Sequence, residues 1–532
     1  MLQIILFVIL IVSGIVSWLS GTFPGSRGRG LPPGPPCVPI LGNALQVPKT
    51  GIHLKFTEWA KKYGPIFSLK IGSSTTVVIN SPYLVKQILD KQSVKYSDRP
   101  NIYIANELIF RGDHLMFLNA GETWRRGRRL YHQQLNEIMC EKQHVALQDA
   151  EAKQMLHDFC LNPDGVMDHP KRYSNSIIMS IVLGIRTPTC GTPHMNGLYR
   201  FMEGLSEILE IGATPPVDVF SIFKYLPEAW FQNWKSRSRA VGDILTNLYE
   251  PLVRLVVYRR QKGDSKGSFL DNLLDKQSKL GLSERDILLM VGNLVEGGSD
   301  TTASMLLVFI QAMVKYPHIQ KQVQAQIDET IGESRSPTWE DFASLPLVNM
   351  VVKECLRWRP VAPTAFPHAA KEDGEIDGLL IPKGSTVILN AWGLHNDPDR
   401  YPDPDTFNPW RYKNHTSLAP TYAASSDYEN RDHYAYGAGR RICPGIHLAE
   451  RGMFIAFAKM LWAFEMSEPV DPQTGLSTPV DVDAETGYME GFLSCPKDFK
   501  VTIRVRSESR RETILREFAT AEKDVFSQYE CL

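Results

Sequence analysis

The stretch Tyr436-Gly-Ala-Gly-Arg-Arg-Ile-Cys-Pro-Gly445 presents one cysteine, Cys443, in a loop that contains three glycines. Glycines remove side chains where a flat ring system must lie close to the backbone. The two arginines before the cysteine can neutralise carboxylates on such a ring. The stretch therefore predicts a thiolate offered to a large, flat, anionic cofactor, with a helix from Ala449 onward. The alternative is a buried free cysteine in a glycine-rich turn, as lone cysteines usually are.

Length and composition indicate an ordinary folded protein. The chain has 532 residues, of which 43% are hydrophobic and 22% charged, and its formal net charge is −1. Because the charge is near zero, no polyanionic partner and hence no nucleic acid is expected. The eight cysteines are far apart and show no CxxC pair. This pattern indicates free thiols in a reducing compartment rather than a disulfide framework.

The first residues differ from the rest of the chain. Residues 2–19 carry no charge, and as a helix they would span about 27 Å, close to the hydrocarbon core of a membrane. Arg27 and Arg29 follow, which predicts a lumenal N-terminus. A cleaved signal peptide is the alternative, but a basic leader and an A-x-A-like site are missing. The expected order is an anchor at 2–19, a Pro/Gly-rich hinge at 20–36, a catalytic body at 37–506 and a charged tail at 507–532, either a surface helix or disordered.

A long apolar segment begins after Ser283, a good N-cap with Asp286 three residues on, and runs to Tyr316. Its length would allow a second membrane span, but Gly297-Gly-Ser-Asp-Thr-Thr302 at mid-span is costly in lipid. A central core helix is therefore predicted. Other expected elements are a strand at 75–80, a helix from 346 to before Pro360, and a strand pair at 379–389 around a Pro-Lys-Gly turn.

At the cysteine loop the chain resembles the cytochrome P-450 family of haem-thiolate monooxygenases, whose signature is Phe-x-x-Gly-x-Arg-x-Cys-x-Gly. Gly439, Arg441, Cys443 and Gly445 match it, whereas Tyr436 replaces the family's phenylalanine. A hydroxyl near the thiolate could change its hydrogen bonding. The resemblance implies a mainly α fold with small β-sheets (α+β), one N-terminal transmembrane helix, and haem b as the cofactor. Cys443 would then be the axial ligand of the haem iron.

The resemblance also gives roles to other motifs, which follow in the family's order. Thr301 would contact bound dioxygen, and Asp300 would feed protons towards it, although alone the two could simply accompany a helix kink. Trp124 and Arg128 fit a Trp-x-x-x-Arg pattern that the family uses for the haem propionates. His368 lies where the family often has a propionate-binding arginine or histidine. The expected haem-binding set is completed by Tyr436, Gly439 and Arg441 of the cysteine loop.

Glu354-Cys-Leu-Arg357 is by itself an ordinary i,i+3 helix ion pair. Its position after the long helix and before Phe407-Asn-Pro-Trp-Arg-Tyr412 matches the family's Glu-x-x-Arg motif. By resemblance, Glu354, Arg357 and Arg411 would make a buried structural network behind the haem.

The implied activity is insertion of one oxygen atom from O2 into a hydrophobic small molecule. Electrons would come from NADPH through a separate flavoprotein, an NADPH-cytochrome reductase, because the chain has no flavin or nicotinamide fingerprint. A basic patch at Arg125, Arg126 and Arg129 could steer this acidic partner. The expected location is the endoplasmic reticulum membrane, single-pass, with a cytosolic catalytic domain. Residues 367–373, 390–396 and 491–496 are similar to filamentous-fungal members of secondary metabolism, in the group that contains the oxidoreductase acting on O-methylsterigmatocystin.

Two rival functions stay open. One is a haem-thiolate isomerase or dehydratase that never activates O2, which the intact Asp300–Thr301 pair disfavours. The other is a non-catalytic haem-binding carrier or sensor, which retention of that pair and of the arginine patch disfavours. The substrate itself does not follow from the fold. An apolar pocket is expected, with walls at 102–110, 202–211, 290–294, 362–366 and 489–492.

Overall fold

The computed structural model describes residues 12–14, 16–17, 23, 25–210, 212–471, 473–489, 491 and 493–531. Most of the predicted anchor at 2–19 lies outside these residues. Among the residues that are described, we find no helix with the length and apolar character needed to cross a membrane. The transmembrane part of the predicted fold therefore stays a prediction.

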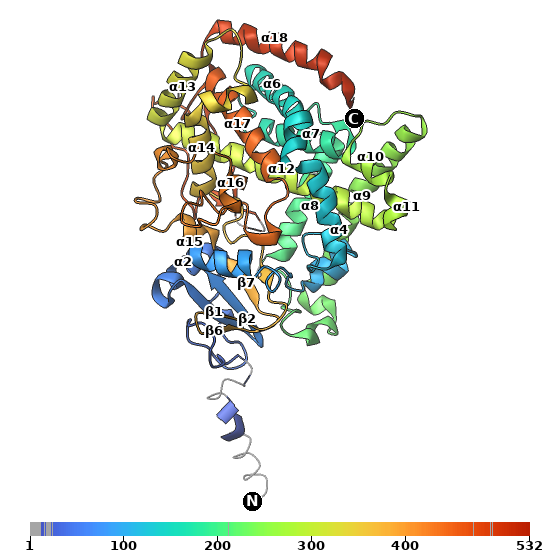
Figure 1. Cartoon of the computed structure of the whole chain (residues 1–532), viewed down its shortest axis with the longest axis vertical. Coiled ribbons are helices and arrows are strands. Elements are labelled where there is room, and N and C mark those ends of the chain that lie inside the picture. The colour runs from blue at the N-terminus through green and yellow to red at the C-terminus, as the bar shows by residue number, and fades with distance from the viewer. Residues whose placement is uncertain are drawn as a thin grey trace, which may run out of the picture.

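Helices make up most of the structure, as predicted (Figure 1). The α-helices are α2 (Ile52–Tyr63), α3 (Pro82–Val85), α4 (Glu122–Leu135), α5 (Glu137–Met139), α6 (Val145–Leu161), α7 (His169–Leu183), α8 (Pro193–Leu209), α9 (Trp234–Gln261), α10 (Phe269–Leu274), α11 (Gln277–Leu280), α12 (Glu284–Lys315), α13 (Pro317–Ile331), α14 (Pro346–Trp358), α15 (Ala391–His395), α16 (Ala419–Ala424), α17 (Ile446–Ala463) and α18 (Glu508–Asp524). Shorter 3-10 or π segments are η1 (Ala44–Gln46), η2 (Lys86–Lys91), η3 (Ile104–Phe110), η4 (Cys140–His144), η5 (Ser221–Lys224), η6 (Glu228–Phe231), η7 (Trp339–Ser344), η8 (Pro409–Tyr412), η9 (Gly439–Arg441) and η10 (Phe526–Gln528).

The strands form small sheets, of which the largest lies at the end of the molecule opposite α18 (Figure 1). Its order is β1-β2-β7-β4, with β1 (Ile66–Ile71), β2 (Ser74–Ile79), β7 (Thr386–Leu389) and β4 (His368–Ala369). Two-stranded pairs are β5 (Gly374–Ile376) with β6 (Leu379–Ile381), β8 (Phe464–Ser467) with β11 (Thr502–Val505), β9 (Tyr488–Met489) with β10 (Cys495–Pro496), and β3 (Ile185–Arg186) with β12 (Glu530–Cys531).

Helix α12 is the central core helix that the sequence predicts. The Ser283 side chain accepts a hydrogen bond from the Asp286 backbone N–H at 3.1 Å, and the Asp286 carboxylate accepts one from the Ser283 N–H at 2.9 Å. This capping box satisfies two of the N–H groups that a helix start leaves unpaired. The helix ends at Lys315, just before Pro317 opens α13. It packs against α7, α14 and α17 and is buried along most of its length.

Two expected elements differ in detail. The strands β6 and β7 exist where the strand pair was predicted, but they do not pair with each other: β6 pairs with β5, and β7 lies between β2 and β4. The turn at Pro382-Lys-Gly384 therefore passes the chain from one sheet to the next. Helix α17 begins at Ile446, three residues before the predicted start, because Gly445 already serves as its N-cap.

The two ends of the body are attached to it by specific contacts. In the predicted hinge, the Arg27 guanidinium donates to the carbonyls of Pro32 and Pro35 at 2.9 and 2.8 Å. The Ser68 N–H of β1 donates to the Pro33 carbonyl at 2.7 Å, so this part of the hinge follows the sheet edge. The charged tail forms helix α18, which packs on α6. Its Arg510 makes ion pairs with Asp328 and Glu333, each at 2.7 Å.

Candidate active site

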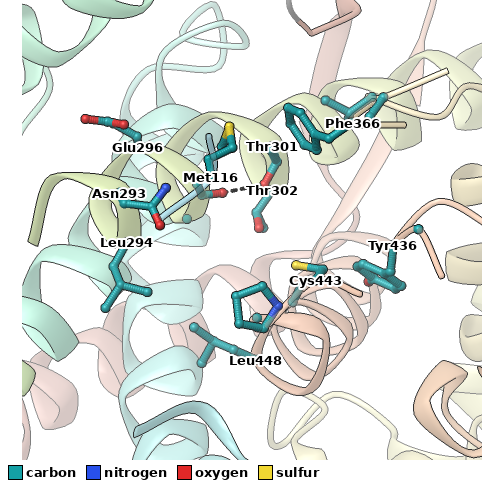
Figure 2. A pocket seen from close by; sticks show the side chains of 18 of the residues that line it. Met116, Asn293, Leu294, Glu296, Thr301, Thr302, Phe366, Tyr436, Cys443 and Leu448 are labelled. Atoms are coloured by element: carbon teal, nitrogen blue, oxygen red, sulfur yellow. Dashed lines mark hydrogen bonds between the residues drawn. The ribbon is translucent and has the colours of Figure 1, made fainter. Parts of the chain in front are cut away.

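A cavity of about 280 Å³ lies between α12 and the loop that carries Cys443. Most of its wall is apolar, with contributions from η3, α4, α7, α8, α12 and the segments around 361–368 and 435–453. Figure 2 shows the sulfur of Cys443 on one side of this space and Thr301 and Thr302 of α12 on the other. Residues more than a hundred positions apart are thus brought to one apolar chamber.

The cysteine loop is held in a shape that needs its glycines. Gly437 and Gly439 have φ angles of 75° and 66°, which favour glycine. A Cβ on Gly439 would come within 2.0 Å of the Leu89 carbonyl oxygen, and the Gly439 N–H donates to Asp90 at 2.8 Å. The Cys443 N–H donates to the Tyr436 carbonyl at 3.0 Å. The loop therefore fixes the Cys443 side chain towards the cavity.

The predicted haem-binding side chains meet at one edge of the cavity. The Arg441 guanidinium lies 4.3 Å from the centre of the Trp124 ring. Arg128 donates to the Ile442 carbonyl in the cysteine loop. His368 donates from Nδ1 to the Tyr96 carbonyl at 2.7 Å, and burial, helped by nearby arginines, lowers its pKa to about 3. His368 is therefore neutral, and its other ring nitrogen, Nε2, accepts rather than donates a hydrogen bond.

Arg99 belongs to this group and was missed by sequence reasoning. It lines the cavity and donates to the carbonyls of Phe366 and Pro367 at 2.9 and 2.7 Å. Burial, together with the nearby charges of Arg441 and Arg128, lowers its pKa to about 9. A single arginine before Pro100 carries no motif, and only the fold brings it beside residues of the cysteine loop. We find no sequence signal that would have identified it.

The arginines at this edge form no close ion pair. Within the described part of the chain, no carboxylate forms an ion pair with Arg99, Arg128 or Arg441. Burial lowers the pKa of Arg441 to about 10, with Asp98 opposing and Arg128 reinforcing the shift. Cations that are removed from water are normally paired. Three partly buried arginines that form no ion pair at a cavity edge fit a ligand that carries carboxylates.

On the opposite side of the cavity, the two adjacent glycines of α12 have different effects on packing. A Cβ on Gly297 would meet nothing within 4 Å, whereas one on Gly298 would come within 2.5 Å of Ile178 on α7. Gly298 thus allows the close packing of α7, and Gly297 leaves space. The Thr301 hydroxyl donates to the Gly297 carbonyl at 2.7 Å. This back-bonding pattern commonly bends helices.

Asp300 does not line the cavity, unlike its neighbour Thr301. Its carboxylate lies 3.9 Å from the Cys495 sulfur, which in turn contacts the Ser304 hydroxyl at 3.0 Å. Burial raises the pKa of Asp300, and Lys171 partly offsets this. The Asp300 carboxyl group therefore keeps its proton to a higher pH than an exposed aspartate does.

The structure brings Glu354, Arg357 and Arg411 together. Arg357 makes a two-point pair with the Glu354 carboxylate at 2.7 and 2.8 Å. The Arg411 Nε lies 3.5 Å from Glu354 Oε1, which also accepts from the Asn408 N–H at 2.8 Å. Burial alone would lower the pKa of Arg357, but the Glu354 carboxylate more than offsets this and raises it. The group ties α14 to η8.

Tyr436 has a buried hydroxyl without a hydrogen-bond partner in the described residues. Burial raises its pKa, and the nearby Glu450 and Cys443 raise it further.

The predicted pocket walls contribute to the cavity in part. The residues from these walls that line it are Phe110, Met202, Leu205, Asn293, Leu294, Ala362, Ala365 and Phe366. Leu493 lines it next to the predicted wall at 489–492, and residues 211, 490 and 492 lie outside the described set.

With this geometry in place, comparison with known proteins identifies the fold. The family model for cytochrome P450 matches residues 32–488. The chain belongs to the cytochrome P450 family. The predicted family and enzyme class, a cytochrome P450 monooxygenase, are therefore confirmed, and haem b is the expected cofactor of this P450.

Similar P450 proteins come from fungi. The chain is 49% identical over 506 residues to cytochrome P450 monooxygenase yanC of Aspergillus niger, with 94% of each protein covered. It is 50% identical over 506 residues to patI of Aspergillus clavatus, covering 95% of this chain and 94% of patI. It is 48% identical over 517 residues to atE of Aspergillus terreus, covering 97% and 95%.

The residues that line the cavity of this P450 fit haem both in their charge and in the space that they leave open. The thiol of Cys443 opens onto the cavity, and three partly buried arginines without a carboxylate ion pair lie at the edge where ring carboxylates would need them. Arg99→Leu is therefore expected to weaken haem retention, because it removes one cation from this edge. Haem transfer to excess apomyoglobin should be several-fold faster than in the wild type. Arg125→Leu, which changes an exposed arginine on α4, should leave the rate unchanged; equal rates for both variants would contradict the assignment.

Proposed function

We propose that the protein inserts one atom of O2 into a hydrophobic small molecule, with electrons from NADPH delivered by a separate flavoprotein reductase. The observation that carries the proposal is that Cys443 and Thr301 face each other across one apolar cavity. Haem, when bound, supplies the redox chemistry that activates O2. Cys443 would hold its iron, and Arg99, Arg128, Arg441 and Trp124 would bind its carboxylates. His368, whose Nδ1–H is donated to Tyr96, would bind a carboxylate only after it takes up a second proton at Nε2.

Thr301 and Asp300 are proposed to manage protons at the site. The Thr301 hydroxyl donates to the Gly297 carbonyl, so its oxygen remains free to accept a hydrogen bond from the cavity side. Because burial raises the pKa of Asp300, this carboxyl group holds a proton nearer to neutral pH and can supply it. Asp300 lies off the cavity wall, so Thr301 would be the group that contacts the ligand and Asp300 the reservoir behind it.

We further propose a role in fungal secondary metabolism, on the endoplasmic reticulum membrane with the body in the cytosol. The support is the similarity to fungal P450 monooxygenases over nearly the whole chain and the uncharged segment at 2–19. The exposed Arg125 and Arg129 on α4 are the proposed contact for an acidic reductase. An isomerase or a haem carrier is the competing function, and neither needs Thr301 in the cavity.

The proposal is tested by reconstituting the full-length holoprotein with an NADPH-cytochrome reductase and NADPH under 18O2. One labelled oxygen atom per product molecule is expected, with NADPH consumed in step. Turnover without label in the product would favour the isomerase or dehydratase. Haem binding without turnover of any compound in a broad panel of apolar molecules would favour the carrier.

A further inference from the structure

One end of the cavity is polar, although the rest of its wall is mostly apolar. His114, Asn293 and Glu296 line it there. His114 Nε2 lies 3.3 Å from Glu296 Oε2, and the two residues are only 2% and 5% exposed. Asn293 and Glu296 are one helical turn apart on α12, and Figure 2 shows both on the side of the cavity away from Tyr436.

The polar groups at this end have capacity that the protein does not use. Neither His114 Nδ1 nor Glu296 Oε1 has a hydrogen-bond partner of normal geometry in the described residues. Tyr249 is buried close by, and burial, then the charge of Glu296 and a side-chain hydrogen bond to it, raise its pKa, so the Tyr249 hydroxyl lies next to the Glu296 carboxylate. Even with Tyr249 as a donor, a carboxylate oxygen can accept more than one hydrogen bond.

A purely structural role explains only part of this arrangement. The His114–Glu296 pair joins the loop before α4 to α12, and the His114 ring stacks on Phe110 with centroids 3.9 Å apart. That accounts for one nitrogen and one oxygen. With Tyr249 next to the second oxygen, it still does not account for the remaining histidine nitrogen, nor for an asparagine amide on the same cavity wall. Buried polar atoms without partners in a native protein call for a missing partner such as water or a ligand.

The chemistry of the missing partner follows from the donors and acceptors present. When His114 Nε2–H donates to Glu296, His114 Nδ1 is an acceptor, as is Glu296 Oε1. Asn293 offers an N–H donor beside them. A ligand hydroxyl can donate to an acceptor and accept from Asn293 at once. An ammonium group cannot accept a hydrogen bond, and a carboxylate would be repelled by Glu296.

We propose that His114, Asn293 and Glu296 bind a hydroxyl group of the substrate, which is therefore a hydrophobic alcohol or phenol. This inference rests on the proposed function. Asn293 and Glu296 precede Thr301 by eight and five residues on α12, which is about 12 and 8 Å along the helix axis. The hydroxyl is thus held at the end of the substrate away from the atom that is oxidised next to Thr301.

Equilibrium binding to the holoprotein tests the inference without reductase, NADPH or turnover. The probes are 2-naphthol and 2-methylnaphthalene, which differ in the hydroxyl but hardly in size, and the readout is the change in the haem Soret band. We expect 2-naphthol to bind about tenfold more tightly, the effect of one good hydrogen bond to a charged group. In the double variant His114→Phe with Glu296→Leu, this preference should fall to about twofold or less.

The double variant removes both members of the buried pair, so that no lone charge is left behind, and phenylalanine can keep the stack on Phe110. Asn293→Leu serves as a second variant that leaves the pair intact and should also reduce the preference. Glu284→Leu, at an exposed acid at the start of α12, should keep it.

Equal binding of the two probes by the wild type, binding of neither, or a preference that survives in both variants would overturn the inference. The proposed function fails independently of it. If labelled oxygen enters a substrate that carries no hydroxyl of its own, and 2-naphthol is not preferred, the proposed function stands and the hydroxyl site is rejected. A clear preference for 2-naphthol without oxygen incorporation would do the reverse.

Discussion

Glu354→Gln is expected to lower the free energy of unfolding by on the order of 3–5 kcal/mol, the usual cost of breaking a buried ion pair from one side. Glu354 and Arg357 are fully buried, and the Glu354 carboxylate also holds Arg411 and the Asn408 N–H. Glutamine keeps the shape but leaves the Arg357 charge uncompensated. Urea unfolding of the holoprotein, followed by tryptophan fluorescence, measures the change.

Glu58→Gln is the matched control. Lys55 and Glu58 form an ion pair with the same i,i+3 spacing at 2.7 Å, but Glu58 is 63% exposed. Solvent-exposed pairs contribute less than about 1 kcal/mol, so this variant should unfold almost like the wild type. If both variants lose the same small amount, the Glu354 group does not carry the stability assigned to it.

The parts of the site that sequence could predict are those fixed by local chemistry. The capping pair Ser283 and Asp286 marks the start of α12 correctly, because a capping box depends only on residues three apart. The glycines around Cys443 predict the loop since its backbone requires them. The Glu354–Arg357 pair was expected from resemblance, and its geometry is that of a closed network.

The parts that sequence missed depend on contacts between distant segments. Arg99 joins Arg128 and Arg441 only after the loop before α4 folds onto the cysteine loop. The His114–Glu296 pair spans 182 positions and has no motif. The pairing of β7 depends on β2 and β4, and β2 lies far away along the chain, so local pattern does not encode it. The β5–β6 hairpin was also missed, although its Asp377-Gly378 turn, with φ angles of 50° and 78°, is a local signal.

Cys443→Ser is expected to abolish the thiolate-type spectrum of the reduced carbon monoxide complex entirely. The hydroxyl of serine does not ionise near neutral pH and is a poor donor to iron. The loop should still form, since its shape comes from Gly437, Gly439 and the hydrogen bond of the residue 443 N–H to Tyr436 rather than from the sulfur. The characteristic band disappears both if haem is lost and if it is retained without a sulfur ligand.

Cys495→Ser provides the control for this change. Cys495 lies beside Asp300 and Ser304 on the other side of the Thr301 segment and does not line the cavity. Its replacement should leave the spectrum intact.

The reduced carbon monoxide spectrum of these two variants, recorded beside the wild type, tests most directly that Cys443 is the haem ligand. We predict the thiolate band in the wild type and in Cys495→Ser, and none in Cys443→Ser. A thiolate band that survives in Cys443→Ser, or that is lost only in Cys495→Ser, would contradict the account.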